Sequence, residues 1–194
     1  MLRALYETLG VEWENNLPWR FGRTKDELEA LHYGAGLLDF SEYGLVELKG
    51  NDRHDFLHNQ CTSDIKKMPT HTALETLFLN NRGQIEHTGV VLNLGESFLI
   101  LSPTAARLAE RFRRYIVFDA VEVSQPDDRT VLRLHGHGAE GVAAALGEIP
   151  GTWGVASAAN TLLARDEYGL WLLPLNEEAE PVARKLLEAG AVPV

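Results

Sequence analysis

The sequence contains a single cysteine, Cys61, and no long apolar run. One thiol excludes an intrachain disulfide, and it excludes any metal site built only from thiolates of one chain. No stretch approaches the roughly 20 apolar residues that cross a bilayer. The N-terminus lacks the apolar core of a secretory signal and soon becomes acidic. These absences favour a cytoplasmic protein without a membrane segment.

Basic residues are also scarce. Lysine and arginine together number 18 against 28 aspartates and glutamates, which gives a formal net charge of -10. Nonspecific contact with nucleic acid depends on clustered Lys and Arg. The basic runs are short, and the longer one, Arg111 to Arg114, falls on a predicted helix as a solvated face. The sequence therefore indicates no direct contact with nucleic acid, while 45% hydrophobic residues suffice for a packed core.

The middle of the chain predicts a compact α+β unit over residues 42–125. The turn Asn80-Asn81-Arg82-Gly83 joins two apolar segments, because Asn and Gly tolerate positive φ. Asn51 is expected to cap one helix, and another is expected to open at Ser102-Pro103, where proline suits the first helical position. Strands are expected over residues 45–48, 74–79, 85–92, 97–101 and 117–123.

The same order of elements recurs beyond the boundary at residues 125–128. A strand, a helix, a hairpin around residues 166–169, a helix and a last strand at 191–194 follow one another. The fold class is therefore predicted as α+β with two ferredoxin-like halves, residues 42–125 and 128–194, after an N-terminal arm of residues 1–41. The arm holds a helix that starts with the capping box Thr24 to Glu27. Because nothing follows the last strand, the second half is expected to be incomplete and to self-associate through that apolar edge.

Generic motifs for chemistry are weak. His54 and His58 are four apart, as in a zinc helix, but the intervening carboxylate is Asp55 rather than Glu, and no third ligand is near. His135 and His137 flank a glycine at a strand-to-helix turn, where a metal is the less favoured interpretation. Cys61 has no basic partner in the sequence and is interpreted as a structural thiol. We expect no metal site and no phosphate-binding loop.

Family resemblance is more specific. Residues 48–65 resemble the pattern (L/V)xGxDxxxFLxxQxTxDV of YgfZ-like proteins and glycine-cleavage T-proteins. Residues 34–41, GAGLLDFS, are similar to their GAGLFDLS, and residues 79–85 resemble their N-x-x-G-x-(I/V) turn and strand. The chain is identified as a member of the glycine-cleavage T-protein superfamily, on its YgfZ-like folate-binding branch.

The resemblance implies ferredoxin-like and barrel domains around a channel that holds tetrahydrofolate. The C-terminal barrel and the YgfZ signature KGCYxGQE are expected beyond residue 194, so the chain is expected to be C-terminally incomplete. Glu167, in Arg165 to Gly169, lies in a segment similar to the TGE-x-G hairpin whose Glu contacts the pterin in T-proteins. The resemblance thus implies that Glu167 binds the pterin, and the alternative is an exposed hairpin carboxylate.

The chain departs from T-proteins at residues 87 and 88. T-proteins carry paired aspartates after GGxx, one of them near the reactive nitrogen of the folate, and His87 and Thr88 stand at the corresponding positions. We therefore expect His87 and Thr88 to contact the folate without a catalytic role. Glu86 is the nearest carboxylate, but strand alternation predicts that it faces away from His87.

The resemblance then favours a folate-binding protein of the YgfZ type. Its implied role is iron–sulfur cluster maturation or tRNA modification, with iron–sulfur assembly proteins as possible partners. The alternative is a folate-dependent aminomethyltransferase like the glycine-cleavage T-protein. A third interpretation is a fragment with only a structural or partner-binding use.

Overall fold

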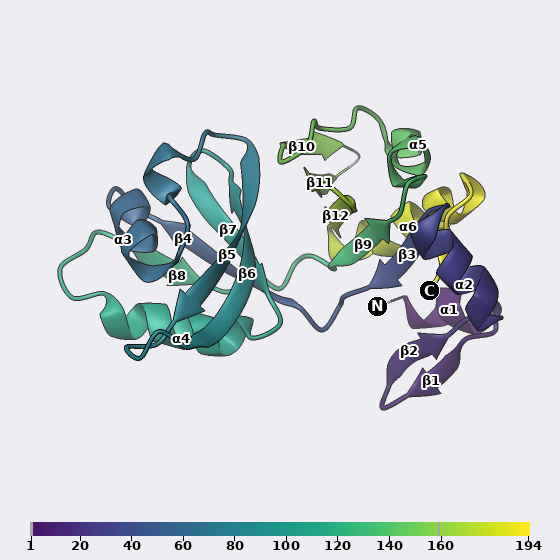
Figure 1. Cartoon of the computed structure of the whole chain (residues 1–194), viewed down its shortest axis with the longest axis horizontal. Helices are drawn as coiled ribbons and strands as arrows, with labels where there is room; N and C mark the ends of the chain where they lie inside the picture. Colours follow the sequence, from purple (N-terminus) through teal and green to yellow (C-terminus); the bar gives the residue numbers. More distant parts are fainter. Residues whose placement is uncertain (1, 159) are drawn as a thin grey trace. The chain divides into compact units, whose positions relative to one another are not determined.

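The computed structural model describes residues 2–158 and 160–194, which form two compact units (Figure 1). The first unit comprises Met1–Ser41, Asp128–Thr152 and Ala156–Val194. The second comprises Glu42–Asp127 and Trp153–Val155. Compact units are not necessarily domains that fold alone, so the division into residues 1–41, 42–125 and 128–194 stays a prediction. Within the described residues, no helix combines the length and the apolar character needed to cross a membrane.

The second unit is an antiparallel sheet with two helices. Its strands lie in the order β5-β6-β7-β4-β8, in which β8, β4, β7 and β6 have the ferredoxin-like arrangement and β5 extends the edge. The elements are β4 (Gly44–Lys49), α3 (Arg53–Gln60), η1 (Ile65–Lys67), β5 (Thr72–Leu79), β6 (Ile85–Asn93), β7 (Ser97–Ser102), α4 (Ala105–Tyr115) and β8 (Glu122–Ser124).

The turn between β5 and β6 forms as the sequence predicts. Gly83 has φ +76°, and its N–H donates to the carbonyl of Asn80 at 2.9 Å. The Asn80 side-chain oxygen also accepts the backbone N–H groups of Arg82 and Gln84. The two strands that this turn joins pair antiparallel.

Three local predictions for this unit are wrong. Helix α3 begins at Arg53, so Asp52 rather than Asn51 is its N-cap residue, and no side chain caps its start. Helix α4 begins two residues after Pro103. The strand predicted over residues 117–123 is reduced to β8, because Val117 and Phe118 lie in a loop with 70% and 97% of their surface exposed. Apolar composition alone therefore suggested a strand where the chain has no sheet to join.

The core of the second unit is aromatic. The ring of Phe112 on α4 makes edge contacts with Phe56 of α3 at 5.8 Å and with Phe78 of β5 at 5.5 Å between centroids. All three side chains are buried. The contacts fix both helices on one face of the sheet, since aromatic pairs prefer this geometry.

The first unit is a six-stranded sheet with helices and a separate hairpin. Its strands lie in the order β10-β11-β12-β9-β3-β13. The sheet and its helices are β3 (Gly36–Asp39), β9 (Leu132–His135), α5 (Ala139–Ala143), η2 (Ala144–Leu146), β10 (Val155–Ala158), β11 (Thr161–Arg165), β12 (Gly169–Pro174), η3 (Asn176–Glu178), α6 (Ala179–Glu188) and β13 (Val192–Pro193). The N-terminal segment adds α1 (Arg3–Thr8), α2 (Thr24–His32) and the hairpin of β1 (Glu12–Glu14) and β2 (Leu17–Arg20), which Asn15 and Asn16 turn at positive φ.

Strand β3 completes this sheet. It pairs antiparallel with β9 and parallel with β13, so a strand from the N-terminal segment lies between two strands of the C-terminal half. The sequence analysis placed residues 36–39 in an arm and did not predict this pairing. The edge strand β13 is half-buried, and self-association through it stays a prediction.

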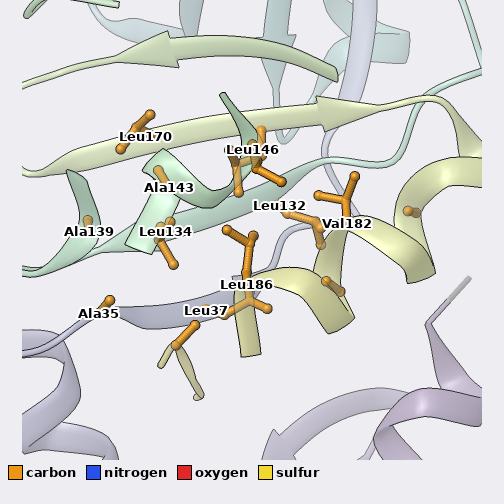
Figure 2. Packing of buried hydrophobic residues seen from close by; sticks show 14 of the residues in the cluster. Ala35, Leu37, Leu132, Leu134, Ala139, Ala143, Leu146, Leu170, Val182 and Leu186 are labelled. Carbon is orange, nitrogen blue, oxygen red and sulfur yellow. The ribbon is translucent and has the colours of Figure 1, made fainter. Parts of the chain in front are cut away.

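Leucines from several elements form the core of the first unit (Figure 2). A single buried cluster contains Leu37 of β3, Leu132 and Leu134 of β9, and Leu186 of α6. Val182 and Leu186 of α6 belong to this core, so the apolar side of the helix faces the sheet. Helix α2 is held differently from the predicted capping box, because Glu27 accepts the N–H groups of Phe21 and Gly22 ahead of the helix.

Candidate functional site

The hairpin that carries Glu167 is organised by Asp166. The Asp166 Oδ1 accepts the backbone N–H groups of Tyr168 at 2.8 Å and Gly169 at 3.0 Å, which closes the turn between β11 and β12. The Arg133 guanidinium of β9 binds both carboxylate oxygens, at 2.6 and 2.9 Å. The two side chains are only 9% and 6% exposed. The turn is thus tied to the neighbouring strand by a buried, bidentate ion pair.

Burial and hydrogen bonding act in opposite directions on Asp166. Burial alone raises the pKa of this carboxyl group, but the hydrogen bonds from Arg133, Tyr168 and Gly169 outweigh it and lower the pKa below 3.8. Arg133 is also covered by the Trp171 ring, with 4.6 Å between the guanidinium carbon and the ring centroid. Asp166 is therefore ionised at neutral pH and holds the hairpin in one shape.

Gly169 is required where the hairpin meets β9. A Cβ atom there would lie 2.0 Å from the carbonyl oxygen of Leu134. The glycine in the segment similar to TGE-x-G thus permits a close approach of two backbones.

Glu167 lies at the tip of this hairpin, exposed, beside a cavity of about 320 Å³. The cavity is lined by Leu31, His32, His135, Gly136, His137, Glu167 and Tyr168. The rings of His135 and Tyr168 are stacked, with 6.3 Å between centroids and 27° between planes. Burial, followed by the nearby Arg133, lowers the pKa of His135. The cavity therefore offers a flat aromatic pair next to one carboxylate.

A β-bulge at the start of β6 determines the second candidate site. Phe78 pairs with His87, but the next residue of β5, Leu79, pairs with Ile85, so Glu86 is the extra residue. A bulge lets two consecutive side chains face the same side. Glu86 and His87 accordingly line the same cleft. The expectation from strand alternation that Glu86 faces away from His87 is wrong for this reason.

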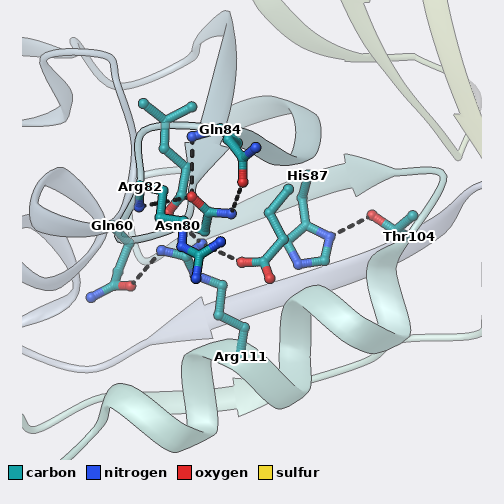
Figure 3. A network of polar contacts seen from close by, with 9 residues as sticks. Gln60, Asn80, Arg82, Gln84, His87, Thr104 and Arg111 are labelled. Atoms are coloured by element: carbon teal, nitrogen blue, oxygen red, sulfur yellow. Dashed lines mark hydrogen bonds and ion pairs between the residues drawn. The ribbon is translucent and has the colours of Figure 1, made fainter.

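His87 is buried and polar. Its Nδ1 lies 2.8 Å from the Thr104 hydroxyl at the start of α4 (Figure 3). Burial, reinforced by Arg111 and Arg107 and opposed by Glu86, lowers the pKa of His87 below 6.5. His87 is therefore a neutral imidazole at neutral pH.

Thr88 lies elsewhere. Its side chain is exposed and is not among the residues that line the cleft of His87, while its carbonyl accepts the Ser102 hydroxyl at 2.7 Å. The structure thus separates the two neighbours that were predicted to share one ligand contact.

Arg111 anchors the cleft of Glu86 and His87, and the sequence analysis missed it (Figure 3). One Arg111 nitrogen donates to the carbonyl of Leu79 at 3.0 Å and to Glu86 Oε2 at 3.2 Å. The other donates to Gln60 Oε1 at 3.4 Å. Arg111 is only 13% exposed, so it is a fixed part of the wall. The sequence predicted that Arg111 lies on a helix, but it did not predict the contact of Arg111 with the bulge.

The weaker motifs do not assemble into sites. The His54 ring packs edge-on against Phe98 at 4.7 Å, and His58 lies 3.5 Å from Asp64. Among the residues that the structure describes, no three His, Cys, Asp or Glu side chains are grouped to hold a metal. Burial raises the pKa of the Cys61 thiol, which disfavours a thiolate nucleophile.

Comparison with known proteins identifies relatives. The family described as GCVT N-terminal domain matches residues 4–151. The aminomethyltransferase of Chloroherpeton thalassium is 26% identical over 97% of this chain and 58% of its own length. That of Anoxybacillus flavithermus is 30% identical over 92% of this chain and 53% of its own length. The chain thus spans about half the length of these curated relatives.

Solved structures support the same fold. Glycine cleavage system aminomethyltransferase T from Bartonella henselae matches all of this chain and 58% of its own chain, with a TM-score of 0.86 and 22% identity. Heterotetrameric sarcosine oxidase from Corynebacterium sp. U-96 matches 85% of this chain with a TM-score of 0.61 and 19% identity. At these identities the likeness establishes the fold alone.

Proposed function

The chain belongs to the glycine-cleavage T-protein superfamily through its GCVT N-terminal domain, and on this premise we propose that it binds tetrahydrofolate and serves folate-dependent aminomethyl transfer. The relatives named above favour this alternative over the YgfZ-like interpretation. Nothing in those matches supports the roles in iron–sulfur cluster maturation or tRNA modification.

The observation that carries the proposal is the cavity at Glu167. The edge of a pterin presents several N–H donors, which a carboxylate accepts in bidentate fashion. Its flat ring requires apolar or aromatic walls, and the stacked His135 and Tyr168 provide them. The cavity of about 320 Å³ is at the lower end of the range for small ligands, which starts near 300 Å³. The residues present therefore fit a pterin ring.

The rigid turn strengthens this assignment. Glu167 follows Asp166, whose bonds to Arg133, Tyr168 and Gly169 fix the backbone on both sides. A carboxylate on a fixed turn loses little conformational freedom when it binds a ligand. We propose that the Glu167 carboxylate accepts the N–H groups at the edge of the pterin.

Glu86 and His87 are the proposed groups for chemistry in the second unit. Bound tetrahydrofolate supplies the nitrogen that receives the one-carbon unit. Transfer to that nitrogen requires a proton acceptor and a charge that stabilises the developing cation. His87 is neutral and can accept a proton, while Glu86 supplies a carboxylate on the same side of the strand. The β-bulge thus brings a negative charge next to His87, which stands at an aspartate position of T-proteins.

A folate-binding protein without turnover is the second candidate. It is favoured by Thr88, an exposed and neutral residue at a position where T-proteins carry an aspartate. Binding without transfer would support this candidate.

The binding test is calorimetry with tetrahydrofolate. Loss of a hydrogen bond to a charged group costs about 1.5–3 kcal/mol, so Glu167→Gln should weaken binding about 10- to 100-fold. Glu177→Gln is the control, because Glu177 is an exposed carboxylate of the same unit outside the cavity. Equal affinity of Glu167→Gln and wild type would refute the assignment.

The turnover test supplies tetrahydrofolate and an aminomethylated lipoyl carrier, and it measures methylene-tetrahydrofolate and ammonia. We expect turnover that falls in Glu86→Gln and in His87→Ala. Turnover that both variants retain would move the chemistry to other residues.

A further inference from the structure

A short chain of hydroxyl groups lies behind His87. The His87 Nδ1 lies 2.8 Å from Thr104 Oγ1 (Figure 3), which lies 3.3 Å from Ser102 Oγ. The Ser102 hydroxyl in turn donates to the carbonyl oxygen of Thr88 at 2.7 Å. His87 lines the cleft that also holds Glu86, whereas Thr104 and Ser102 are not among the residues that line it. Since Nδ1 is engaged by Thr104, Nε2 is the ring nitrogen that remains for a ligand in the cleft.

The direction of these hydrogen bonds follows from the number of protons. A carbonyl oxygen only accepts, so the single proton of the Ser102 hydroxyl is committed to Thr88. Ser102 Oγ also accepts the backbone N–H of Thr104 at 3.2 Å. Ser102 is fully buried, so bulk water does not compete for its oxygen. The contact between the two hydroxyl groups therefore becomes a hydrogen bond only if Thr104 donates to Ser102.

The hydroxyl proton of Thr104 decides which nitrogen of His87 carries the imidazole proton. A neutral imidazole has one N–H donor and one acceptor nitrogen. If Thr104 donates to Ser102, its oxygen accepts from Nδ1–H, and Nε2 keeps a lone pair. If Thr104 donates to Nδ1 instead, the His87 proton lies on Nε2, and the contact with Ser102 contains no proton. The first arrangement makes one hydrogen bond more, and hydrogen bonds in a chain strengthen one another.

Glu86 is the nearby group that could favour the opposite tautomer, because a carboxylate can accept an Nε2–H. Its Oε2 is held by the Arg111 guanidinium at 3.2 Å. Among the residues that the structure describes, no hydrogen bond joins Glu86 to His87, while the bond between His87 and Thr104 is present. The hydroxyl chain is thus the interaction that sets the tautomer.

We propose that Thr104 and Ser102 are positioning residues that keep neutral His87 protonated on Nδ1, so that Nε2 presents a lone pair to the cleft. The tautomer does not depend on what the cleft binds, but its use rests on the proposed aminomethyl transfer. The proton from an N–H bond that breaks during transfer binds the Nε2 lone pair, while the bonding electrons stay on the nitrogen that lost it. The imidazolium keeps its Nδ1–H bond to Thr104. His87 thus takes up a proton without any rearrangement of the hydroxyl chain.

The test is ¹⁵N NMR of the intact chain with labelled histidine at about pH 8, where the lowered pKa of His87 keeps the ring neutral. Protonated and unprotonated ring nitrogens have distinct shifts, and the His87 signals are those that disappear in His87→Gln. We expect wild type to carry the proton mainly on Nδ1. Thr104→Val removes the hydroxyl but no capping bond of α4, and Ser102→Ala removes the acceptor of the Thr104 proton. Each should lower the ratio of Nδ1–H to Nε2–H about 2- to 10-fold, the effect of one hydrogen bond, whereas Thr104→Ser should keep the wild-type ratio.

Thr62→Val is the matched control. The Thr62 hydroxyl contacts Thr76 and the N–H of Leu77 in the same unit, and it has no part in the chain behind His87. This variant should keep the wild-type ratio of tautomers. A wild type with the proton mainly on Nε2, or an unchanged ratio in a folded Thr104→Val or Ser102→Ala, overturns the proposal.

The result is separable from that of the proposed function, because the tautomer is measured without folate. In the turnover assay, kcat of Thr104→Val should fall about 2- to 10-fold with KM unchanged, and Thr104→Ser should keep the wild-type kcat. If the ratio of tautomers responds as expected but wild type shows no turnover, the hydroxyl chain stands and the proposed reaction falls. If wild type turns over with the His87 proton on Nε2, the positioning role falls alone.

Discussion

The buried pair of Arg133 and Asp166 provides the sharpest test of how the hairpin of Glu167 is held. In Asp166→Ala the carboxylate disappears, and the Arg133 side chain, of which only 9% is exposed in the wild type, loses its ionic partner. Removal of one partner from a buried pair costs about 3–5 kcal/mol, because the other charge is left without compensation. The N–H groups of Tyr168 and Gly169 lose their acceptor in the same change. We expect the free energy of unfolding of the first unit to fall by at least about 3 kcal/mol.

Urea titration followed by tryptophan fluorescence measures this loss. Three of the four tryptophans, Trp13, Trp19 and Trp171, belong to the first unit, and Trp171 lies directly over Arg133. The control is Glu180→Ala, which breaks the pair with Arg184 whose side chains are 41% and 49% exposed. An exposed helical pair contributes only about 0.3–0.5 kcal/mol.

Asp166→Asn separates charge from hydrogen bonding. The amide oxygen still accepts from Tyr168 and Gly169, but it no longer compensates Arg133, so its loss should be intermediate. The lowered pKa of Asp166 means that its stabilisation is complete above the ordinary value of 3.8 and is lost as the pH falls through the folded-state value. The gap between wild type and Asp166→Ala should therefore shrink in acid below 3.8. A loss in Asp166→Ala no larger than that in Glu180→Ala would refute the reasoning.

Two further predictions concern the remaining site residues. Because the folded-state pKa of His87 lies below its ordinary value of 6.5, stability should be complete above 6.5 and fall as the pH decreases through the folded-state value. His87→Gln should flatten this pH dependence in thermal melts, with the residual slope coming from His135, whose pKa is lowered in the same direction; an unchanged slope would show that His87 is not buried as described. Gly169→Ala should destabilise the first unit by about 1–3 kcal/mol, because its Cβ would lie 2.0 Å from Leu134 O and two strands must separate. Gly141→Ala, where nothing lies within 4 Å on helix α5, should stabilise by about 0.5–1 kcal/mol, and the same sign in both variants would contradict the packing argument.

Local signals made much of the fold predictable. The Asn80 to Gly83 turn and the strands beside it were read correctly, because turn chemistry and apolar alternation act within a few residues. The position of β3 was not predictable in this way. Its four residues pair with β9 almost a hundred residues later in the chain, and no local pattern encodes such a partner.

The candidate sites divide along the same line. The turn that presents Glu167 could be anticipated, but its anchor could not, since Arg133 and Asp166 are 33 residues apart in sequence. Strand alternation placed Glu86 on the side of β6 opposite His87. That prediction failed because the bulge adds one residue to the strand, and no sequence pattern marks the bulge. The arginines of α4 were interpreted as a solvated helix face. Their shared cleft with Arg82 depends on the packing of α4 against the sheet.

The pairing of Glu86 with Arg111 bears on whether Glu86 can act in chemistry. Glu86 is 49% exposed, so its ion pair with Arg111 is weak and its carboxylate can turn toward a ligand at little cost. Arg111 does not become stranded by this movement, because Leu79 O and Gln60 Oε1 continue to accept from its guanidinium. His87 stays in place through Thr104. In the proposed transfer reaction, His87 would therefore act as a base held in a fixed position, and Glu86 would act as a carboxylate that can move.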